Sequence, residues 1–387
     1  MSVKRSLIKS LPQLMKQYPV VALTGPRQSG KTTLLKNTYK DFRYVNLENP
    51  DIRNFAELDP NSFLKEYDQH VIFDEVQRVP QLFSYLQQII DESGKPGQFI
   101  LSGSQNFHLM QSITQSLAGR VAMVKLFPFD HNEMKSAGLL DEEFFLSNLF
   151  RGYYPAIFDR NIPPKTFYYN YVQTYIQRDV SELINIRNMR LFQNFLGLCA
   201  ARAGQLLNLN ALANECGISQ PTAKAWLSAL EQSYILFQLQ PYYKNFSKRI
   251  VKTPKLYFYD TGLLCYLLKI KDSAELNLHV SKGALFENMM VAEYVKQMYH
   301  KNEMEDLWFW RDASGNEIDL MIDGSKNITI VEMKATTTIK SDMFKGLLHF
   351  EKISKFTNLK KQLVYGGNQS QKRSVAQVIS WKDFTTV

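Results

Sequence analysis

The chain has 387 residues, enough for two or three domains that each bury a core of their own. Hydrophobic residues make up 45% and charged residues 21%, a balance that excludes a disordered, collagen-like or rod-shaped coiled-coil protein. The 46 Lys and Arg residues exceed the 37 Asp and Glu residues, so the net charge is +9. Such an excess favours polyanionic partners, with nucleic acid among them.

The three cysteines, Cys199, Cys216 and Cys265, are far apart in the sequence and lack the close Cys or His spacing of a zinc site. They indicate a reduced, cytoplasmic protein. The first residues, MSVKRSLIKSLPQLMKQYP, break up their apolar residues with Lys, Gln and Pro, unlike a signal peptide. No apolar run approaches the roughly 20 residues that a bilayer crossing needs. We therefore expect neither secretion nor a membrane partner.

Short apolar runs of β type alternate with amphipathic segments in the first third of the chain. This alternation predicts an α/β unit with a mainly parallel sheet. The predicted strands are 20–23, 43–47, 71–73, 98–102 and 121–126.

Helical spacing dominates from about Leu139 to Tyr266, and the pattern is mixed again after Lys282. There we expect a helix over 284–298 and two strands, EIDLMI and ITIVEMK, joined by a turn at 323–325. The chain is therefore predicted to be an α/β protein of three domains. They are a P-loop domain with a parallel sheet at 1–138, a helical domain at 139–281, and an α/β domain at 282–387.

A phosphate-binding motif, G-x-x-x-x-G-K-[ST], follows the first predicted strand and precedes a predicted helix. Its glycines let backbone amides turn toward the β-phosphate of ATP, and the positive end of the helix dipole faces the same charge. Lys31 would bridge the β- and γ-phosphates, and Thr32 would bind Mg²⁺. The predicted nucleotide-binding residues are Gly25, Pro26, Arg27, Gln28, Ser29, Gly30, Lys31, Thr32 and Thr33. The alternative is a glycine-rich turn with a solvated lysine.

Two carboxylates end the predicted strand Val71-Ile72-Phe73 and supply the second half of this site. Asp74 would hold Mg²⁺ with Thr32, and Glu75 would orient or deprotonate the attacking water. The sequence thus predicts an ATPase that uses Mg²⁺ as its cofactor.

The chain resembles the predicted prokaryotic AAA-type ATPases that are fused to the domain of unknown function 4143. The resemblance rests on Gly-Pro-Arg-Gln-Ser-Gly-Lys-Thr, Val-Ile-Phe-Asp-Glu-Val-Gln, Leu-Ser-Gly-Ser-Gln and Leu-Ala-Gly-Arg, in that order. Residues 169–180, YNYVQTYIQRDV, are similar to the signature between the two parts, so the resemblance covers almost the whole chain. It implies an AAA-type domain followed by a region that often ends in a nuclease-like fold.

The same resemblance implies two further roles in catalysis. In AAA-type ATPases a polar group after the strand at 98–102 senses the γ-phosphate, which here points to Ser104 or Gln105. An arginine before the next strand reaches the γ-phosphate of a neighbouring subunit, which points to Arg120 and to a homo-oligomer. The alternatives are a plain turn for the first and a salt bridge at the strand entrance for the second.

A helix-turn-helix is predicted in the middle domain, with helices over 209–216 and 220–231 and a turn at Gly217-Ile218-Ser219. This is the layout of a winged helix. The start of the second helix presents Gln220, Thr222 and Lys224, which suit contacts to DNA bases or phosphates. The competing interpretation is a packing module whose second helix contacts protein.

A carboxylate and lysine pattern near the C-terminus follows the order of a PD-(D/E)xK nuclease. Glu287 lies on a predicted helix, Asp319 on a strand, and Glu332 and Lys334 on the next strand, where period two places them on one face. Two neighbouring carboxylates would bind Mg²⁺ and Lys334 would position the attacking water. The alternative is a surface ion pair between Glu332 and Lys334 on a fold without this chemistry.

The main hypothesis is therefore an ATPase whose nucleotide state moves a DNA-contacting helical domain and a nuclease-like domain. Two alternatives stay open. One is a nucleotide-gated module with little turnover that binds DNA or a protein partner, and the other is a metal-dependent DNA nuclease that the ATPase regulates.

Overall fold

The computed structural model describes residues 3–103, 113, 115–180, 186, 188–242, 251–324 and 327–386, without the side chains of 177–180. The chain forms two compact units. The first consists of Met1–Phe129, Gln232–Tyr234 and Tyr299–Glu303, and the second of Asp130–Glu231, Ile235–Met298 and Met304–Val387.

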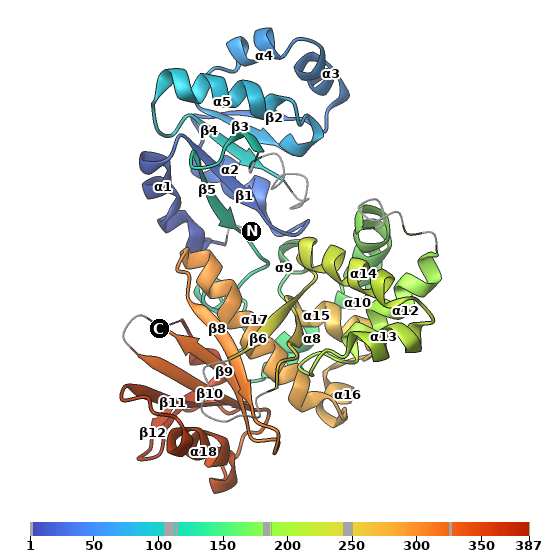
Figure 1. The fold of residues 1–387 in the computed structure, drawn as a ribbon, viewed down its shortest axis with the longest axis vertical. Helices are drawn as coiled ribbons and strands as arrows, with labels where there is room; N and C mark the ends of the chain where they lie inside the picture. The colour runs from blue at the N-terminus through green and yellow to red at the C-terminus, as the bar shows by residue number, and fades with distance from the viewer. Residues whose placement is uncertain are drawn as a thin grey trace. The chain divides into compact units, whose positions relative to one another are not determined.

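A five-stranded parallel sheet in the order β2-β3-β4-β1-β5 forms the centre of the first unit (Figure 1). All five strands lie where the β-type runs predicted them, and every residue of β1, β3 and β4 is buried. The strands are β1 (Val20–Thr24), β2 (Arg43–Asn46), β3 (Val71–Asp74), β4 (Phe99–Ser102) and β5 (Val121–Lys125).

Helices cover both faces of this sheet, as the burial of its central strands requires. On one face η1 (Ser6–Lys9), α1 (Leu11–Gln17) and α2 (Lys31–Thr38) pack on Val21 and Leu23 of β1. On the other face α3 (Pro50–Leu58), α4 (Pro60–Glu66) and α5 (Leu82–Ser93) pack on Val20 and Ala22. Alternate residues of β1 thus enter two separate cores. The short helix η2 (Val76–Arg78) follows β3.

Two short stretches from later in the chain complete the first unit. Tyr234 places its hydroxyl 2.8 Å from Thr24 Oγ1, and its ring meets Phe127 edge-on at 5.5 Å between centroids. His300 accepts a hydrogen bond from the backbone amide of Phe127 at Nε2, at 3.0 Å. Thr24 ends β1, so one of these contacts supports the strand that leads into the phosphate-binding motif.

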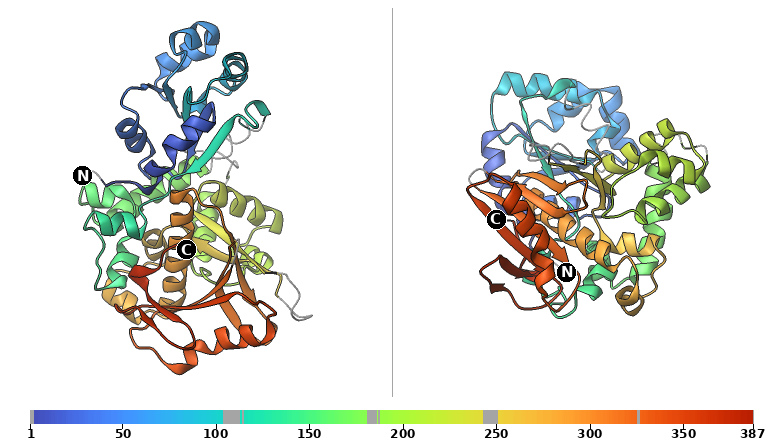
Figure 2. Two further views of the ribbon diagram at one scale, coloured as in Figure 1. Left: turned by 90° about the vertical axis from the view of Figure 1, so that its left-hand side faces the viewer. Right: turned by 60° about the horizontal axis from the view of Figure 1, so that its bottom comes forward.

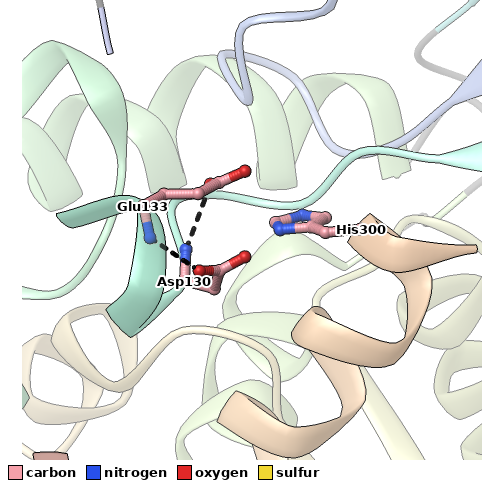
Figure 3. A group of neighbouring side chains, drawn as sticks. All are labelled: Asp130, Glu133 and His300. Atoms are coloured by element: carbon pink, nitrogen blue, oxygen red, sulfur yellow. Dashed lines mark hydrogen bonds between the residues drawn. The ribbon is translucent and has the colours of Figure 1, made fainter. Parts of the chain in front are cut away.

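The second unit begins with a helix, α7, whose start is capped by side chains. At the start of α7, Asp130 Oδ1 accepts from the amide of Glu133, and Glu133 Oε2 accepts from the amide of Asp130, a reciprocal capping box (Figure 3). The helical segments before the sheet are α7 (His131–Ser136), α8 (Phe145–Arg151), α9 (Pro155–Asp159), α10 (Pro164–Tyr171), η3 (Val172–Val180), α12 (Met189–Ala200), α13 (Leu209–Cys216) and α14 (Gln220–Gln232).

An eight-stranded mixed sheet in the order β12-β13-β11-β10-β9-β8-β6-β7 organises the rest of the second unit. Its strands are β6 (Leu236–Pro241), β7 (Lys255–Phe258), β8 (Asp306–Arg311), β9 (Glu317–Asp323), β10 (Ile328–Lys334), β11 (Leu359–Tyr365), β12 (Gln371–Lys372) and β13 (Gln377–Ser380). The predicted hairpin is confirmed, because β9 and β10 pair antiparallel with Ile328 opposite Asp323.

Helix α18 (Lys345–Ile353), after η4 (Ser341–Phe344), lies across one face of this sheet, as Figure 2 shows. Its Leu347 and Phe350 pack on Ile330 of β10 and Leu363 of β11. The remaining helices are α15 (Thr261–Leu267), α16 (Ser273–Leu278), α17 (Lys282–Lys301) and η5 (Trp381–Asp383). Helix α17 contains the predicted helix at 284–298 and extends it at both ends.

The sheet of the second unit joins strands from the middle and last predicted domains, since β6 and β7 precede residue 282. The three-part division at 1–138, 139–281 and 282–387 stays a prediction. The three cysteines are buried thiols outside any disulfide. No helix in the described ranges combines the length and apolar character that a bilayer span requires.

Candidate functional site

Glycine is required at both ends of the loop between β1 and α2. Gly25 has a φ of 146° and Gly30 a φ of 94°, backbone conformations that other residues rarely adopt. A Cβ at Gly25 would also collide with the carbonyl oxygen of Leu126. Gly30 provides no side-chain cap for α2. The first amides of this helix are therefore available for an anion, which a helix N-terminus favours.

Lys31 lies inside this loop instead of in solvent. Its Nζ donates to the carbonyl oxygens of Gly25 and Pro26, both at 2.9 Å, and the side chain is buried. Burial lowers the pKa of Lys31 to about 8, although Glu75 and Asp74 act in the opposite direction. The hydrogen-bond acceptors of this buried ammonium are neutral carbonyl groups. A phosphate group bound in the loop would give it a negatively charged partner.

Asp74, at the end of β3, accepts four hydrogen bonds that hold its carboxylate at the sheet edge. The donors are Thr32 Oγ1 at 2.8 Å, the Tyr44 hydroxyl at 2.5 Å, Ser102 Oγ at 2.5 Å and the amide of Glu75 at 3.2 Å. Because β3 and β1 run parallel on either side of β4, Asp74 and the phosphate-binding loop meet at the same edge.

Glu75 follows with a φ of 53°, a left-handed conformation that is uncommon for a residue with a side chain. Its Oε2 accepts a hydrogen bond from the Gln77 side-chain amide. Strained backbone of this kind concentrates at functional sites. Glu75 is only half-buried, whereas Asp74 is buried.

The donor set at this edge fits Mg²⁺. Thr32 and Asp74 offer a hydroxyl and a carboxylate oxygen 2.8 Å apart, and small hard cations prefer oxygen ligands of this type. Arg27, Gln28, Ser29 and Thr33 complete the predicted loop, with Ser29 buried and Gln28 in a left-handed conformation at a φ of 61°.

Arg120 lies at the start of β5, at the edge of the sheet opposite the loop, because Val121 pairs with Val20 at the start of β1. Its Nε and Nη2 bind the two carboxylate oxygens of Asp91 at 2.5 and 2.9 Å. This salt bridge is the structural alternative that the sequence left open. The role toward a neighbouring subunit stays a prediction, and Ser104 and Gln105 lie outside the described residues.

The sequence reasoning missed three residues of this site. Tyr44 on β2 and Ser102 on β4 bind Asp74, and Arg5 donates to the carbonyl oxygens of Ser29 and Phe127 at 2.7 and 2.6 Å. Ser102 stands in the run Leu-Ser-Gly-Ser-Gln that carried the sensor prediction. Tyr44 and Arg5 carry no motif; the sheet order brings Tyr44 to the site, and Arg5 reaches it from the segment before η1.

In the helical region α13 and α14 lie at the positions predicted for the helix-turn-helix. Gly217 ends α13 with a φ of 71°, and Ser219 Oγ accepts from the amide of Thr222 at 3.3 Å as the N-cap of α14. Gln220 and Lys224 are exposed and Thr222 is half-buried. The antiparallel pair of β6 and β7 follows α14. Contact of these three side chains with DNA stays a prediction.

The four residues of the predicted nuclease pattern come together in the second unit. Val331 pairs with Leu320 in the antiparallel hairpin. One position further along the pair, Glu332 comes opposite Asp319, so their side chains lie on the same face of the sheet. Lys334 Nζ is 2.8 Å from Glu332 Oε2, and Asp319 Oδ2 accepts from the amide of Met333 at 2.7 Å. Glu287 of α17 joins them through its charge interaction with Asp319.

Three residues outside the predicted pattern also belong to this cluster. Lys255 Nζ lies 2.8 Å from Glu287 Oε1 and also contacts Glu317 Oε1. The Tyr257 hydroxyl donates to the same Glu287 oxygen at 2.7 Å. We call these residues, with the four predicted ones, the carboxylate cluster. Lys255 and Tyr257 come from β7, far from the E-x-K motif in sequence, so spacing could not reveal them.

Negative charge exceeds positive charge in the carboxylate cluster. Burial, reinforced by Asp319 and opposed by Lys255, raises the pKa of Glu287 to about 7. Burial and Asp319 likewise raise the pKa of Glu332 to about 8, against the effect of Lys334. Buried carboxylates that hold protons near neutral pH would lose those protons to solvent when a cation binds. The types of residue present therefore fit a divalent metal ion.

Three known protein families match successive parts of the chain. The AAA domain family matches residues 17–135, a domain of unknown function (DUF8612) matches 142–274, and a second domain of unknown function (DUF4143) matches 282–384. Uncharacterized protein Rv2008c of Mycobacterium tuberculosis is 32% identical over 343 residues, which are 87% of this chain and 74% of that protein.

The chain belongs to the family of AAA-domain proteins that carry DUF4143. Uncharacterized protein Mb2031c of Mycobacterium bovis, another relative, has the same identity and coverage. Among solved structures, the Walker-type ATPase PABY2304 of Pyrococcus abyssi is similar with 15% identity and a TM-score of 0.41, over 67% of this chain and 94% of that one. Within this family, the AAA match covers the loop at 25–32 and both carboxylates that follow β3.

Proposed function

We propose that this member of the family binds ATP with Mg²⁺ and hydrolyses it in its first unit, in the cytoplasm. The observation that carries the proposal is the pairing of Thr32 with Asp74 beside the buried Lys31. Lys31 and the first amides of α2 bind the phosphates. Glu75 orients the attacking water and takes its proton. Bound Mg²⁺ neutralises charge on the phosphate oxygens.

ATP turnover by the purified full chain tests this assignment. We expect Mg²⁺-dependent release of phosphate that falls by at least about 100-fold in Lys31→Ala and in Glu75→Gln, because each variant removes a group that acts on the transition state. Glu75→Gln should retain ATP binding, since the amide keeps the shape of the side chain. Lys40→Ala, a change at an exposed lysine just after α2, is the control. Unchanged turnover in either site variant contradicts the proposal.

A nucleotide-gated module is the alternative within the same site. Here ATP acts as a conformational ligand, and DNA or a protein partner is the output. Turnover well below one per minute, with partner affinity that depends on ATP, would favour this alternative. Single-turnover measurements separate slow chemistry from slow product release.

For the helical region we propose contact with DNA through the start of α14. The exposed Gln220 and Lys224 support this, together with seven basic and three acidic residues over 198–260. DNA affinity should fall steeply with salt, and Lys224→Ala should weaken binding and make the salt dependence shallower. Filter binding without detectable DNA at low salt would exclude this role and favour the packing module.

A second candidate function, metal-dependent DNA cleavage, rests on the assembly of Glu287, Asp319, Glu332 and Lys334 in one cluster. In this proposal Lys334 positions the water and the carboxylates hold the cation. Plasmid nicking with Mg²⁺ or Mn²⁺ should occur with the wild type and disappear in Asp319→Ala and Lys334→Ala. Nicking that survives both changes would have another origin.

A further inference from the structure

Lys255 holds an unusual position for a lysine. Its side chain is 3% exposed, and its Nζ lies between carboxylates that come from two different elements, Glu287 of α17 and Glu317 of β9. Its charge also acts on Asp319. A lysine is almost never fully buried unless it is paired. Lys255 is therefore a built-in part of the carboxylate cluster and not a surface group that has folded over it.

The Nζ atom of Lys255 lies where a bound metal cation would lie. A divalent metal ion binds carboxylate oxygens from several elements at short range, and Lys255 already occupies oxygens of Glu287 and Glu317. Two cations held by the same carboxylates repel each other, the more strongly because little water is present to screen them. A metal ion can therefore bind these oxygens only if the ammonium leaves them.

We propose that Lys255 is the resident cation of the carboxylate cluster and competes with a divalent metal ion for Glu287 and Glu317. This inference shares one premise with the proposed DNA cleavage, namely that the carboxylate cluster binds a divalent metal ion. It assigns Lys255 a regulatory role, because Glu287 and Glu317 have a cationic partner without metal for as long as the lysine stays in place.

Lys255 is also carried by a different part of the chain from the four predicted residues. It begins β7, which pairs with β6, the strand that follows α14. Glu287, Asp319, Glu332 and Lys334 lie on α17, β9 and β10. Lys255 therefore brings its charge to the carboxylates from an element outside the predicted pattern.

Titration of the full chain with Mn²⁺, in the absence of nucleotide, tests the proposal. The concentration of free Mn²⁺ is read by electron paramagnetic resonance. We expect weak binding to the wild type and at least tenfold tighter binding to Lys255→Met. Lys255→Gln, which keeps hydrogen-bond donors without the charge, should gain affinity as well and serves if the methionine variant is unstable.

Two further variants locate the effect. Lys296→Met is the matched control, because Lys296 is equally buried and lies 2.9 Å from Glu293 of the same helix. It should leave Mn²⁺ binding at the wild-type level. Addition of Asp319→Asn to Lys255→Met should remove the gain, since Asp319 belongs to the cluster. Circular dichroism shows which variants fold.

Equal Mn²⁺ affinity in the wild type and Lys255→Met would overturn the inference, and so would the lack of any gain in both folded Lys255 variants. The proposal of DNA cleavage fails separately. If Lys255→Met gains Mn²⁺ but neither it nor the wild type nicks plasmid DNA, Lys255 is the resident cation of a cluster that does not cleave DNA.

Discussion

At the scale of single residues, the first unit places charge where water cannot solvate it well. Lys31 is buried among backbone carbonyls, and Asp74 is surrounded by hydroxyl groups. Both side chains have hydrogen-bond partners in the protein without ligand. The positive charge of Lys31 would bind the phosphates of a nucleotide, and the negative charge of Asp74 would bind its metal ion. The affinity for nucleotide should therefore depend on the protonation of Lys31.

Nucleotide binding is predicted to weaken at alkaline pH. Below a pH of about 8 Lys31 carries its charge, so the affinity is constant there. Bound phosphate raises the pKa of Lys31, so above pH 8 binding must take up a proton, and Kd rises up to about tenfold per pH unit. Fluorescent ATP analogues at pH 7 to 9.5 measure this. Lys31→Ala should show no such dependence, and a flat wild-type profile would contradict the prediction.

Tyr44→Phe tests the hydroxyl groups around Asp74. The change removes one donor to the carboxylate and keeps the ring, over which Lys36 lies at 3.7 Å. A hydrogen bond to a charged group contributes about 1.5–3 kcal/mol. We expect the Mg²⁺ concentration for half-maximal ATP turnover to rise several-fold. Tyr39→Phe is the control, since the Tyr39 hydroxyl is buried without a hydrogen-bond partner among the described residues.

These examples show what the sequence could predict at this scale. Lys31, Thr32 and Asp74 belong to local motifs, so their chemistry could be inferred from neighbours along the chain. Tyr44 and Ser102 contact Asp74 only because β2 and β4 flank β3. Lys255 reaches Glu287 through the packing of α17 on the sheet. Partners of this kind depend on strand order and helix packing, which a local pattern does not contain.

At the scale of elements, Arg120 and Asp91 join the start of β5 to the last turns of α5. Two roles for the arginine make different predictions. If Arg120 acts on the nucleotide of a neighbouring copy, Arg120→Ala loses hydrolysis and keeps ATP binding, whereas Asp91→Asn keeps hydrolysis. Activity per protein should then rise with concentration. Equal losses in the two variants would assign the pair to the structure alone.

Helix α18 approaches the carboxylate cluster at Gly346, its second residue. A Cβ there would collide with the side-chain oxygen Oε1 of Glu332 and with the backbone carbonyl oxygen of Glu317, which is part of β9. Overpacking of this kind costs about 1–3 kcal/mol. Gly346→Ala should lower the free energy of unfolding in urea by that amount. Gly283→Ala on α17, where a Cβ meets nothing within 4 Å, should not; similar losses in both would exclude the collision as the cause.

The positions of the elements were more predictable than their associations. Short apolar runs located the strands of the first unit, and the helix over 284–298 was expected from the pattern along the chain. That β6 pairs with β8, and so extends the C-terminal sheet by β6 and β7, was not predicted. Pairing between strands separated by some 65 residues leaves no trace in either strand alone.

At the scale of the whole molecule, the first unit is assembled from three stretches of chain. A fragment ending at residue 138 would lack Tyr234, the partner of Thr24, and His300, the partner of the Phe127 amide. We expect this fragment to melt at a lower temperature than the full chain and to bind nucleotide more weakly. Calorimetry and ATP titration of both proteins measure this. A fragment equal to the full chain in both respects would contradict the prediction.

This arrangement constrains how the gene could be rearranged. A domain encoded by one uninterrupted stretch can be moved to another gene by a single recombination at each end. Here Tyr234 and His300 would stay behind, so an exchange at a boundary near residue 138 would separate β1 from part of its support. Inheritance of the two units together is therefore favoured by the way that the chain folds, independently of any advantage in their joint activity.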